Sequence, residues 1–399
     1  MRAMRGVVLA LAIGMGLAIP RAAAQGSLSP PGAPGPMMKT LAQIEPRTPI
    51  TNAPFTITQP GAYYLANNVT SATDGVTIRT NGVVLDLMGF SITGDRSSSG
   101  DIGVYILGTN SAPIHDVVVR NGSIRNFGYG IRADHSRGGR LEGLNVASNA
   151  NGGIWLYGRF GKCLGNAIVE CSIQDNGGEG IFFYGYGGQC DGNTIEDCTI
   201  AGSRLDGVTF SGIGGQCDGN ALVRSVISGN SSNAVYLDGT SSGRCVGNVV
   251  RECAIVGNGQ IGVFLNGTSS GTCHGNVISE CTVVGNGNMG ILLTTSGSGA
   301  CNDNVVENCV IQGNVDSGIH LVYARSTRVD GNHVSGQSGL SYGISCVTTS
   351  SNLITRNTCV GQVNNFILDP DDTYGPTVTN KGALANTGAP AHPWANFKR

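Results

Sequence analysis

The sequence predicts an all-β protein, a single-stranded right-handed parallel β-helix of about ten or more coils with short N- and C-terminal caps. Three observations predict this fold. The chain contains 63 glycines and only 13% charged residues, and Gly, Asn, Ser, Thr, Ile and Val dominate its internal stretches, as expected for turns and short strands. A glycine followed by Ile or Val recurs mostly every 27 or 28 residues. Within a repeat, no ten-residue stretch has helical periodicity.

Each repeat is expected to contain three short strands separated by Gly, Asn and Ser turns. The first strand follows the recurrent glycine, or an alanine in one repeat, with apolar positions at Val104, Ile131, Ile154, Ile181, Val208, Val235, Val263, Ile291, Ile319 and Ile344. The second strand carries Ile168, Ile195, Leu222, Val250, Ile278 and Val306. The third carries Ile173, Ile200, Ile227, Ile255, Val283 and Ile311. Equivalent strands should pair about 4.8 Å apart, which places equivalent residues in columns.

Asparagine and cysteine ladders follow from this stacking. The asparagine columns are Asn166, Asn193, Asn220, Asn248, Asn276 and Asn304, and Asn176, Asn230, Asn258, Asn286 and Asn314. The cysteine columns are Cys163, Cys190, Cys217, Cys245, Cys273 and Cys301, and Cys171, Cys198, Cys253, Cys281 and Cys309. Stacked amides would bond to one another and to turn backbone. Neighbouring cysteines are close enough for disulfides, and stacked free thiols are the alternative.

The first 24 residues have the pattern of a secretory signal peptide. Arg2 and Arg5 precede an apolar run at 7–19, and alanines at 22–24 supply a cleavage signal, so the mature chain is expected to begin at Gln25. Removing three arginines leaves 21 basic and 26 acidic side chains, a net charge of −5, which argues against a nucleic-acid partner. No later segment has 18 uninterrupted apolar residues, so no membrane span is expected in the mature chain. The protein is therefore expected to be secreted, to the periplasm or beyond the cell.

The rest of the chain divides by composition. Residues 25–39 are a linker rich in Pro and Gly, and residues 40–68 are expected to form the N-terminal cap and first strands. The β-helix itself is expected over 69–368, and 369–399 drops the repeat and is expected to form the C-terminal capping tail. Caps are expected because both ends of such a rod expose strand edges. Trp394 and Phe397 are the side chains expected to anchor the tail.

These repeats resemble a known superfamily. The run "GVTIRTNGVVLDLMGFSITG" at 75–94 and the N-x-I-x-x-(C/N)-x-I-x-G-N units resemble right-handed β-helix proteins of the pectate-lyase-like superfamily. The leader "IEPRTPI" with "FTITQPGAYYLANN", and the ending "YGP" with "HPWANF", resemble a group of secreted bacterial proteins with that fold. The resemblance covers roughly residues 39–399 and implies the fold. It does not imply one activity, because the superfamily contains lyases, hydrolases, epimerases and adhesins.

Two outward columns of the Gly-Ile strand concentrate aromatic residues. Side chains alternate between inward and outward positions along a strand. Only 6% of the chain is aromatic, yet seven aromatics occupy these columns: Tyr105, Trp155, Tyr157, Phe182, Tyr184, Tyr236 and Phe264. An outward aromatic stripe offers stacking faces to sugar rings, whereas ordinary packing beneath loops is the alternative. The predicted substrate-binding residues are Trp155, Tyr157, Phe182, Tyr184, Tyr236 and Asp238.

Carboxylates on the same face are candidates for catalysis. Glu179 and Asp206 are 27 residues apart and thus equivalent in adjacent coils, where they could act as general acid and base or nucleophile, or hold Ca²⁺. Asp134 and Arg132 lie within a few coils and complete the candidate catalytic set. The alternative is two solvated acids. The sequence contains no complete match to the Asp and His set of polygalacturonases or the Asp and Arg set of pectate lyases, and it predicts no metal-ligand cluster.

The function predicted from these patterns is binding of a polysaccharide along the aromatic and acidic strand face, with its cleavage there as a second expectation. An enzyme of this kind would be a polysaccharide lyase or a glycoside hydrolase. The alternative is a non-catalytic structural or adhesive rod, in which the ladders serve rigidity alone. A periplasmic accessory role in metal-cofactor assembly, known for some β-helix proteins, is disfavoured because His and Met ligands are not clustered. The sequence does not predict an oligomeric state.

Overall fold

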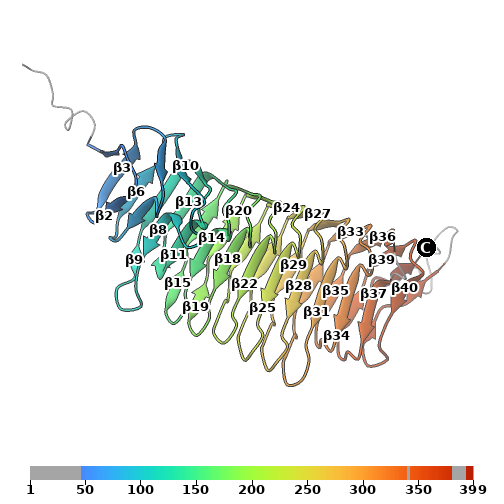
Figure 1. Cartoon of the computed structure of the whole chain (residues 1–399). Coiled ribbons are helices and arrows are strands. Elements are labelled where there is room, and N and C mark those ends of the chain that lie inside the picture. The colour runs from blue at the N-terminus through green and yellow to red at the C-terminus, as the bar shows by residue number, and fades with distance from the viewer. Residues whose placement is uncertain (1–45, 339–341, 380–391, 399) are drawn as a thin grey trace, which may run out of the picture. The chain divides into compact units, whose positions relative to one another are not determined.

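The computed structural model describes residues 46–338, 342–379 and 392–398. The expected signal peptide and linker, and residues 40–45 of the expected N-terminal cap, lie outside these described residues. From Arg47 onward the chain forms one compact unit, a right-handed parallel β-helix of stacked coils (Figure 1). No helix occurs among the described residues. The predicted fold class is therefore confirmed.

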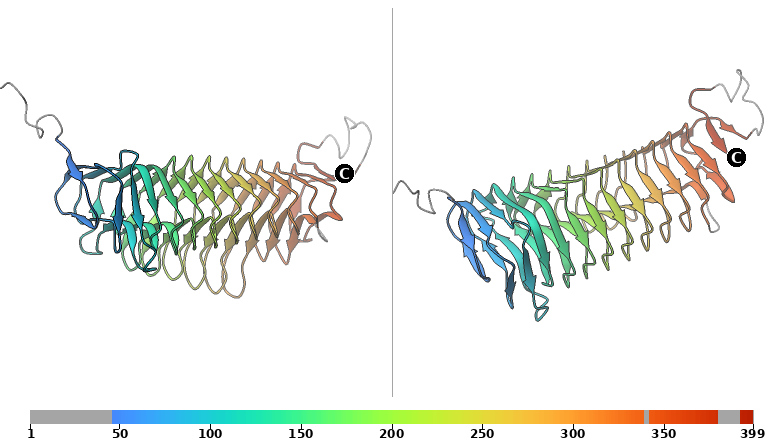
Figure 2. Two further views of the ribbon diagram at one scale, coloured as in Figure 1. Left: turned by 45° about the horizontal axis from the view of Figure 1, so that its top comes forward. Right: turned by 90° about the horizontal axis from the view of Figure 1, so that it is seen from above.

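Two parallel sheets, A and B, run along the rod, and Figure 2 shows strands in continuous rows; a third parallel sheet, C, is short. Sheet B has 13 strands and contains the Gly-Ile strands: β2 (Phe55–Ile57), β5 (Val76–Ile78), β8 (Ile102–Leu107), β11 (Tyr129–Asp134), β14 (Gly152–Tyr157), β18 (Ile181–Tyr184), β22 (Val208–Ser211), β25 (Val235–Asp238), β28 (Val263–Asn266), β31 (Ile291–Thr294), β34 (Ile319–Val322), β37 (Tyr342–Val347) and β40 (Asn364–Ile367). Sheet C has four short strands: β9 (Ile114–His115), β12 (Ser136–Arg137), β15 (Lys162–Leu164) and β19 (Gln189–Asp191).

Sheet A consists of two strand rows joined by two long strands that belong to both. The first row is β1 (Thr48–Ile50), β3 (Gly61–Leu65), β6 (Val83–Asp86), β10 (Val117–Arg125), β13 (Arg140–Ala147), β16 (Ala167–Val169), β20 (Thr194–Glu196), β23 (Ala221–Val223), β26 (Val249–Arg251), β29 (Val277–Ser279), β32 (Val305–Glu307), β35 (Arg328–Asp330), β38 (Leu353–Thr355) and β41 (Thr373–Tyr374). The second row adds β4 (Val69–Ser71), β7 (Ser91–Gly94), β17 (Ser172–Gln174), β21 (Thr199–Ala201), β24 (Val226–Ser228), β27 (Ala254–Val256), β30 (Thr282–Val284), β33 (Val310–Gln312), β36 (His333–Ser335), β39 (Thr358–Val360), β42 (Thr377–Val378) and β43 (Asn396–Lys398). β10 and β13 pair with strands of both rows.

The register of sheet B confirms the predicted columns. Ile154 pairs with Ile181, and Ile181 pairs with Val208, one coil after another. These inward side chains are fully buried in a single apolar core that runs through the coils. Inside the rod, the rings of Phe183 and Phe210 stack with centroids 4.9 Å apart. Burial of repeated aliphatic and aromatic side chains is the main driving force for the coil stack.

The predicted asparagine ladders satisfy buried turn backbone. The Oδ1 atom of Asn220 accepts hydrogen bonds from the backbone N (2.8 Å) and from Nδ2 (3.1 Å) of Asn193. Asn220 in turn donates from Nδ2 to the carbonyl oxygen of Cys190 at 3.0 Å and to Asn248 Oδ1 at 3.1 Å. The same bonds recur along the column, so each buried amide serves two neighbouring coils. This periodic polar network is possible because every coil repeats the same turn.

The cysteines lie inside the coils as free thiols. All thirteen are buried, and Cys163 pairs in register with Cys190 in sheet C. Cys190 Sγ donates to the carbonyl oxygen of Leu156 at 3.5 Å. Burial raises the pKa of the Cys163 and Cys190 thiols, which disfavours the thiolate form. The structure therefore contains the stacked-thiol alternative of the two that the sequence left open.

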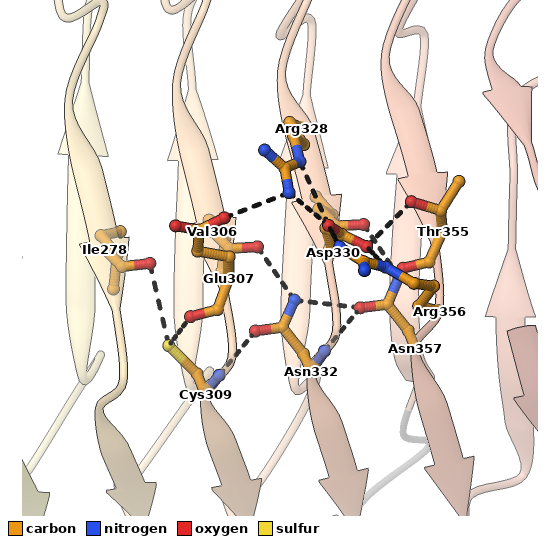
Figure 3. A network of polar contacts seen from close by, with 11 residues as sticks. Ile278, Val306, Glu307, Cys309, Arg328, Asp330, Asn332, Thr355, Arg356 and Asn357 are labelled. Atoms are coloured by element: carbon orange, nitrogen blue, oxygen red, sulfur yellow. Dashed lines mark hydrogen bonds and ion pairs between the residues drawn. The ribbon is translucent and has the colours of Figure 1, made fainter. Parts of the chain in front are cut away.

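An ion-pair cluster covers the C-terminal coils (Figure 3). Asp330 is only 2% exposed. It accepts hydrogen bonds from Arg356 Nε at 2.7 Å and Thr355 Oγ1 at 2.9 Å, and it pairs with Arg328. The guanidinium of Arg356 also lies over the Trp394 ring, 5.6 Å from its centroid. Arg356 thus links Asp330 of β35 to Trp394 of the tail.

The tail continues the asparagine pattern into its last strand. Asn396 Oδ1 accepts from the backbone N of Asn357 at 3.0 Å, and Asn396 Nδ2 donates to the carbonyl oxygen of Ile354 at 3.0 Å. Phe397 pairs with Thr358 in sheet A. Trp394, in contrast, is half exposed. Backbone pairing and the buried Asn396 amide therefore hold the tail more than the Trp394 ring does.

Candidate functional site

Aromatic rings of two adjacent strands form a patch on the outer face of sheet B. Trp155 pairs with Phe182 and Tyr157 with Tyr184 across β14 and β18. Trp155 and Phe182 meet edge to face with centroids 4.8 Å apart, and Phe182 lies 5.1 Å from Tyr184. Tyr157 and Tyr184 are 5.3 Å apart. The parallel register places like side chains on neighbouring coils, so four predicted ligand-binding rings come together.

Tyr129 joins this patch, although the alternation rule did not select it. Its ring contacts Trp155 edge to face at 4.7 Å. The Trp155 ring has room to lie back over its own strand because residue 152 is glycine: a Cβ there would come within 2.4 Å of Trp155 Nε1. That nitrogen is buried and has no hydrogen-bond partner among the described residues. The useful sequence signal was Gly152, which leaves space beside the Trp155 ring.

The patch also extends onto the turns that follow β14 and β18. Tyr184 and Tyr186 stack at 5.9 Å, and Phe160 meets Tyr186 at 5.6 Å. The guanidinium of Arg159 lies 4.8 Å from the Phe160 centroid. Phe160 is 58% exposed. Strand periodicity could not predict these residues, because they lie in the turns between strands.

Tyr236 lies in a second and smaller aromatic group. It stacks on Phe264 with centroids 4.9 Å apart, and its hydroxyl accepts from Asn266 Nδ2 at 2.9 Å. Between the two groups, β22 presents Thr209 and Ser211 at the outward positions. The predicted stripe is therefore interrupted by one coil of small side chains.

Arg132 and Asp134 engage each other. Arg132 donates from Nε to Asp134 Oδ1 at 2.7 Å and from Nη2 to Oδ2 at 3.0 Å. The Tyr105 hydroxyl donates to Asp134 Oδ2 at 2.7 Å, and burial together with this bond raises the pKa of Tyr105. The Arg132 guanidinium lies 4.2 Å from the Tyr157 centroid. Asp134 is thus already bonded to Arg132 and Tyr105. This geometry suits a polar border of the aromatic patch better than a free catalytic acid.

Glu179 and Asp206 have different surroundings. Burial, with the nearby charge of Asp206 adding to it, raises the pKa of Glu179. Asp206 accepts at Oδ1 from the backbone N (2.8 Å) and Nδ2 (3.0 Å) of Asn233, and at Oδ2 from Thr209 Oγ1 (3.2 Å). Asp206 is thus held by three hydrogen-bond donors, whereas burial favours the protonated form of Glu179. Two neighbouring carboxyl groups in such different surroundings are candidates for an acid and base pair.

Asp238 is a third acid near this pair. It is buried, and its Oδ1 accepts from the backbone N of Thr240 at 3.1 Å. Burial raises the pKa of Asp238, and the charge of Asp206 also raises it. The structure therefore brings Glu179, Asp206 and Asp238 into electrostatic contact over three successive coils. Arg132 and Asp134 form a separate group on β11.

Over the described ranges, no three His, Cys, Asp or Glu side chains are grouped so that they could hold a metal ion. In the same residues, no helix is long and apolar enough to cross a membrane.

Comparisons with known proteins agree with the coil geometry. Residues 63–213 match the family described as "Right handed beta helix region". The chain is a right-handed parallel β-helix repeat protein. A further region of this β-helix repeat protein, residues 206–385, matches the family described as "Periplasmic copper-binding protein (NosD)". No curated protein matches the sequence.

Solved structures similar to this β-helix repeat protein share its fold at low identity. A double mutant of the periplasmic alginate epimerase AlgG is 13% identical, with a TM-score of 0.56 and 74% of each chain covered. The A-module of the Azotobacter vinelandii mannuronan C-5 epimerase AlgE6 is 15% identical, with a TM-score of 0.58, covering 79% of this chain and 89% of that one. The catalytic unit of a GH87 α-1,3-glucanase from Streptomyces thermodiastaticus is 12% identical, with a TM-score of 0.54, covering 80% and 63%.

The copper named in the second family description was tested against the side chains present. Copper ligands in proteins are thiolates, thioethers and imidazoles gathered at one point. Here the described His, Cys, Asp and Glu residues form no such group, and burial keeps the Cys163 and Cys273 thiols protonated by raising their pKa. The described His, Cys, Asp and Glu residues of this β-helix repeat protein therefore form no cluster of three or more ligands that could hold copper.

Proposed function

We propose that this β-helix repeat protein is exported and binds a polysaccharide along the outer face of sheet B. The observation that carries the proposal is the patch of four half-buried rings in register on β14 and β18: Trp155, Tyr157, Phe182 and Tyr184. Sugar rings stack on aromatic faces, and their hydroxyls bond to polar groups at the rim. The Arg132–Asp134 pair supplies such a rim, since it is fixed against Tyr157.

The comparisons support this proposal by analogy of fold. The three similar structures named above are, by their descriptions, two alginate or mannuronan epimerases and one glucanase. All act on long glycans, and a β-helix offers an extended face along which a glycan can lie. The word "periplasmic" in the NosD and AlgG descriptions supports export, as does the signal-peptide pattern. Fold alone does not carry function, so the site residues must be tested.

Cleavage is the second part of the proposal. Glu179 would donate a proton to the leaving oxygen, because its pKa is raised, and Asp206 would be its partner as base or nucleophile. Asp238, buried one coil further along, would add a third carboxyl group near the substrate. The reaction would be that of a glycoside hydrolase or a polysaccharide lyase.

Retention on immobilised acidic and neutral polysaccharides tests the binding proposal. We expect the double variant Trp155→Ala, Phe182→Ala to lose at least tenfold in retention while the rod stays folded. Tyr374→Ala is the matched control, because Tyr374 is an exposed aromatic on sheet A. Unchanged retention of the double variant would overturn the proposal and favour the structural or adhesive rod.

Release of reducing ends and of unsaturated uronate, with and without calcium, tests the cleavage proposal. Product that disappears in Glu179→Gln and in Asp206→Asn would place the chemistry at these two acids. Product that persists in both variants, or no product from any polysaccharide, would refute the cleavage proposal and leave only the binding proposal.

A further inference from the structure

The turns that leave sheet B differ sharply in length along the rod. Six residues, 267–272, follow β28 before Cys273, and six residues, 295–300, follow β31 before Cys301. After β34, a single residue, Tyr323, precedes the buried Ala324. The next pairing fixes this alignment, since Asn302 bridges to Arg325. The turn 295–300 therefore has no equally long neighbour on its C-terminal side.

A pocket of about 470 Å³ lies at this step in turn length. Ser296, Ser298 and Asn302 line it from the coil of the long turn, and Tyr323 and Arg325 line it from the next coil. Figure 1 shows the long turns projecting beyond the ends of the sheet B strands. The pocket is lined by hydroxyls, amides, one ring and one guanidinium, and by no acidic side chain.

Tyr323 is held on the pocket wall by the short turn. Its φ of 55° is in the left-handed region, which a one-residue connection between two strands requires. The side chain is 49% exposed. A bulky residue in this backbone conformation is uncommon, because Asn, Asp and Gly adopt it more readily. The turn itself therefore does not explain why an aromatic residue is found at position 323.

Arg325 has no ion-pair partner among the residues that the structure describes. The contrast with Arg328, three residues later, is clear, because Arg328 pairs with both Glu307 and Asp330. The Arg325 side chain is exposed, and the backbone on either side of it is fixed by bridges to Asn302 and Ser350. An unpaired guanidinium with fixed backbone on a pocket wall is suited to bidentate binding of a carboxylate.

We propose that this pocket binds an acidic sugar residue, a uronate, at one end of the polysaccharide site. Arg325 pairs with the uronate carboxylate, the Tyr323 ring packs against the sugar ring, and Ser296 and Asn302 bond to its hydroxyls. The turn after β31 is in the same row as the turns that carry Phe160 and Tyr186, so one glycan can run along this edge of sheet B. The inference rests on the proposed function for that longer glycan, and it adds the chemical class of the sugar.

Titration calorimetry with hexauronates tests this inference. The probes are the hexamers of galacturonate, mannuronate and guluronate, each compared with its carboxyl-reduced, neutral counterpart. We expect the full mature chain to bind at least one hexauronate tenfold or more tightly than its neutral counterpart, and Arg325→Gln to remove that difference. Arg79→Gln is the control, because Arg79 is an exposed arginine that follows β5, far along the chain from the pocket.

A second variant separates the ring from the charge. Tyr323→Asn removes the ring and keeps a residue that tolerates positive φ, so the turn is preserved. We expect it to weaken binding of the uronate and of its neutral counterpart by a similar factor, about three- to tenfold. Equal affinity of wild type and Arg325→Gln for every hexauronate would overturn the inference. Inorganic sulfate that competes as well as the hexauronate at matched ionic strength would also overturn it, by indicating a simple anion site.

The variants distinguish this inference from the proposed function. If Trp155→Ala, Phe182→Ala loses retention but Arg325→Gln keeps its uronate preference, the aromatic face binds glycan and the pocket inference is wrong. If Arg325→Gln loses the preference while the aromatic double variant retains polysaccharide normally, the pocket inference stands and the proposed aromatic site is wrong.

Discussion

The inner and outer columns of sheet B come from the same strands but change very differently from coil to coil. On β18, Phe183 points into the core and Phe182 lies outside. Inside the rod, aliphatic residues, asparagines and cysteines repeat with few substitutions, because each must fit the same space in every coil. Outside, the column reads Tyr105, Arg132, Trp155, Phe182, Thr209 and Tyr236. The outer positions can change from coil to coil, so aromatic side chains gathered in one outer column indicate a ligand-binding surface. The repeated side chains inside the rod indicate a requirement for stability.

Alanine substitutions of the two adjacent phenylalanines of β18 should give the largest difference in the free energy of unfolding. Phe183→Ala removes a fully buried ring that stacks on Phe210 at 4.9 Å, and should lower the free energy of unfolding by about 3–5 kcal/mol. Phe182→Ala removes a half-buried outer ring, and should lower it by about 1 kcal/mol or less. Guanidinium unfolding followed by circular dichroism measures both, and polysaccharide retention should show the reverse order. Equal losses of stability would contradict the division between inner and outer columns.

Breaking an inner asparagine ladder should cost slightly less. Asn220→Ala leaves the backbone N–H and Nδ2 of Asn193 without their acceptor in a buried turn. Asn193 Nδ2 keeps its bond to the carbonyl oxygen of Cys163, so only the backbone N–H is left unsatisfied, and a loss of about 1–3 kcal/mol in the free energy of unfolding is expected. Hydrogen exchange should show the loss of protection concentrated in the coils on either side of residue 220. Gln312→Ala, on the exposed side of β33, is the control, and a change at Asn220 no larger than the change at Gln312 would refute the ladder's role.

The inner columns could be predicted from sequence because they depend on spacing alone. A repeat of 27 or 28 residues places Asn193 over Asn220, independently of which side chains lie on the outer face. The outer positions of Trp155 and Tyr157 also followed from alternation along the strand. Which outer side chains touch did not follow, because it depends on rotamers and on gaps such as Gly152, over which the Trp155 ring lies. The engagement of Asp134 by Arg132 and Tyr105 is of the same kind.

The lengths of the turns that follow sheet B were indicated only indirectly by the spacing of the repeats. The step of 25 residues between Ile319 and Ile344 shows that a coil is short, but not which of its turns has lost residues. The structure places the deletion after β34, where Tyr323 is the whole turn. A similar deletion follows β11, where His135 is a one-residue turn with φ 52°. There a Cβ at Gly161 would come within 2.3 Å of the His135 ring, so the next turn covers it, whereas the step at Tyr323 is open.

Asp330 is an acidic side chain that two arginines contact and that is almost fully buried. Burial acts to raise its pKa, but hydrogen bonds from Arg356, Arg328 and Thr355 prevail and lower the pKa of Asp330 to about 2. A carboxyl group with a depressed pKa in the folded state stabilises the protein above its unfolded pKa of 3.8, and this contribution is lost as the pH falls towards 2. Asp330→Asn should remove up to about 2 kcal/mol at neutral pH. Thermal unfolding between pH 7 and pH 2 should show a smaller acid-dependent fall for the variant; an unchanged pH profile would contradict the ion-pair account.

Glu179 is the opposite outer acid, and its effect on stability should be the smallest. Burial raises its pKa, with Asp206 adding to the rise, so the folded state holds a proton that the unfolded state has already lost. The folded state is therefore disfavoured as the pH rises from the unfolded pKa of 4.5 through the raised folded value. Glu179→Gln should remove this penalty and stabilise the rod at pH 8 by less than about 1 kcal/mol, with no gain at pH 4. Thermal unfolding at the two pH values measures the difference. Destabilisation at pH 8 would mean that the Glu179 carboxylate has a structural partner, and would weaken its assignment as the proton donor.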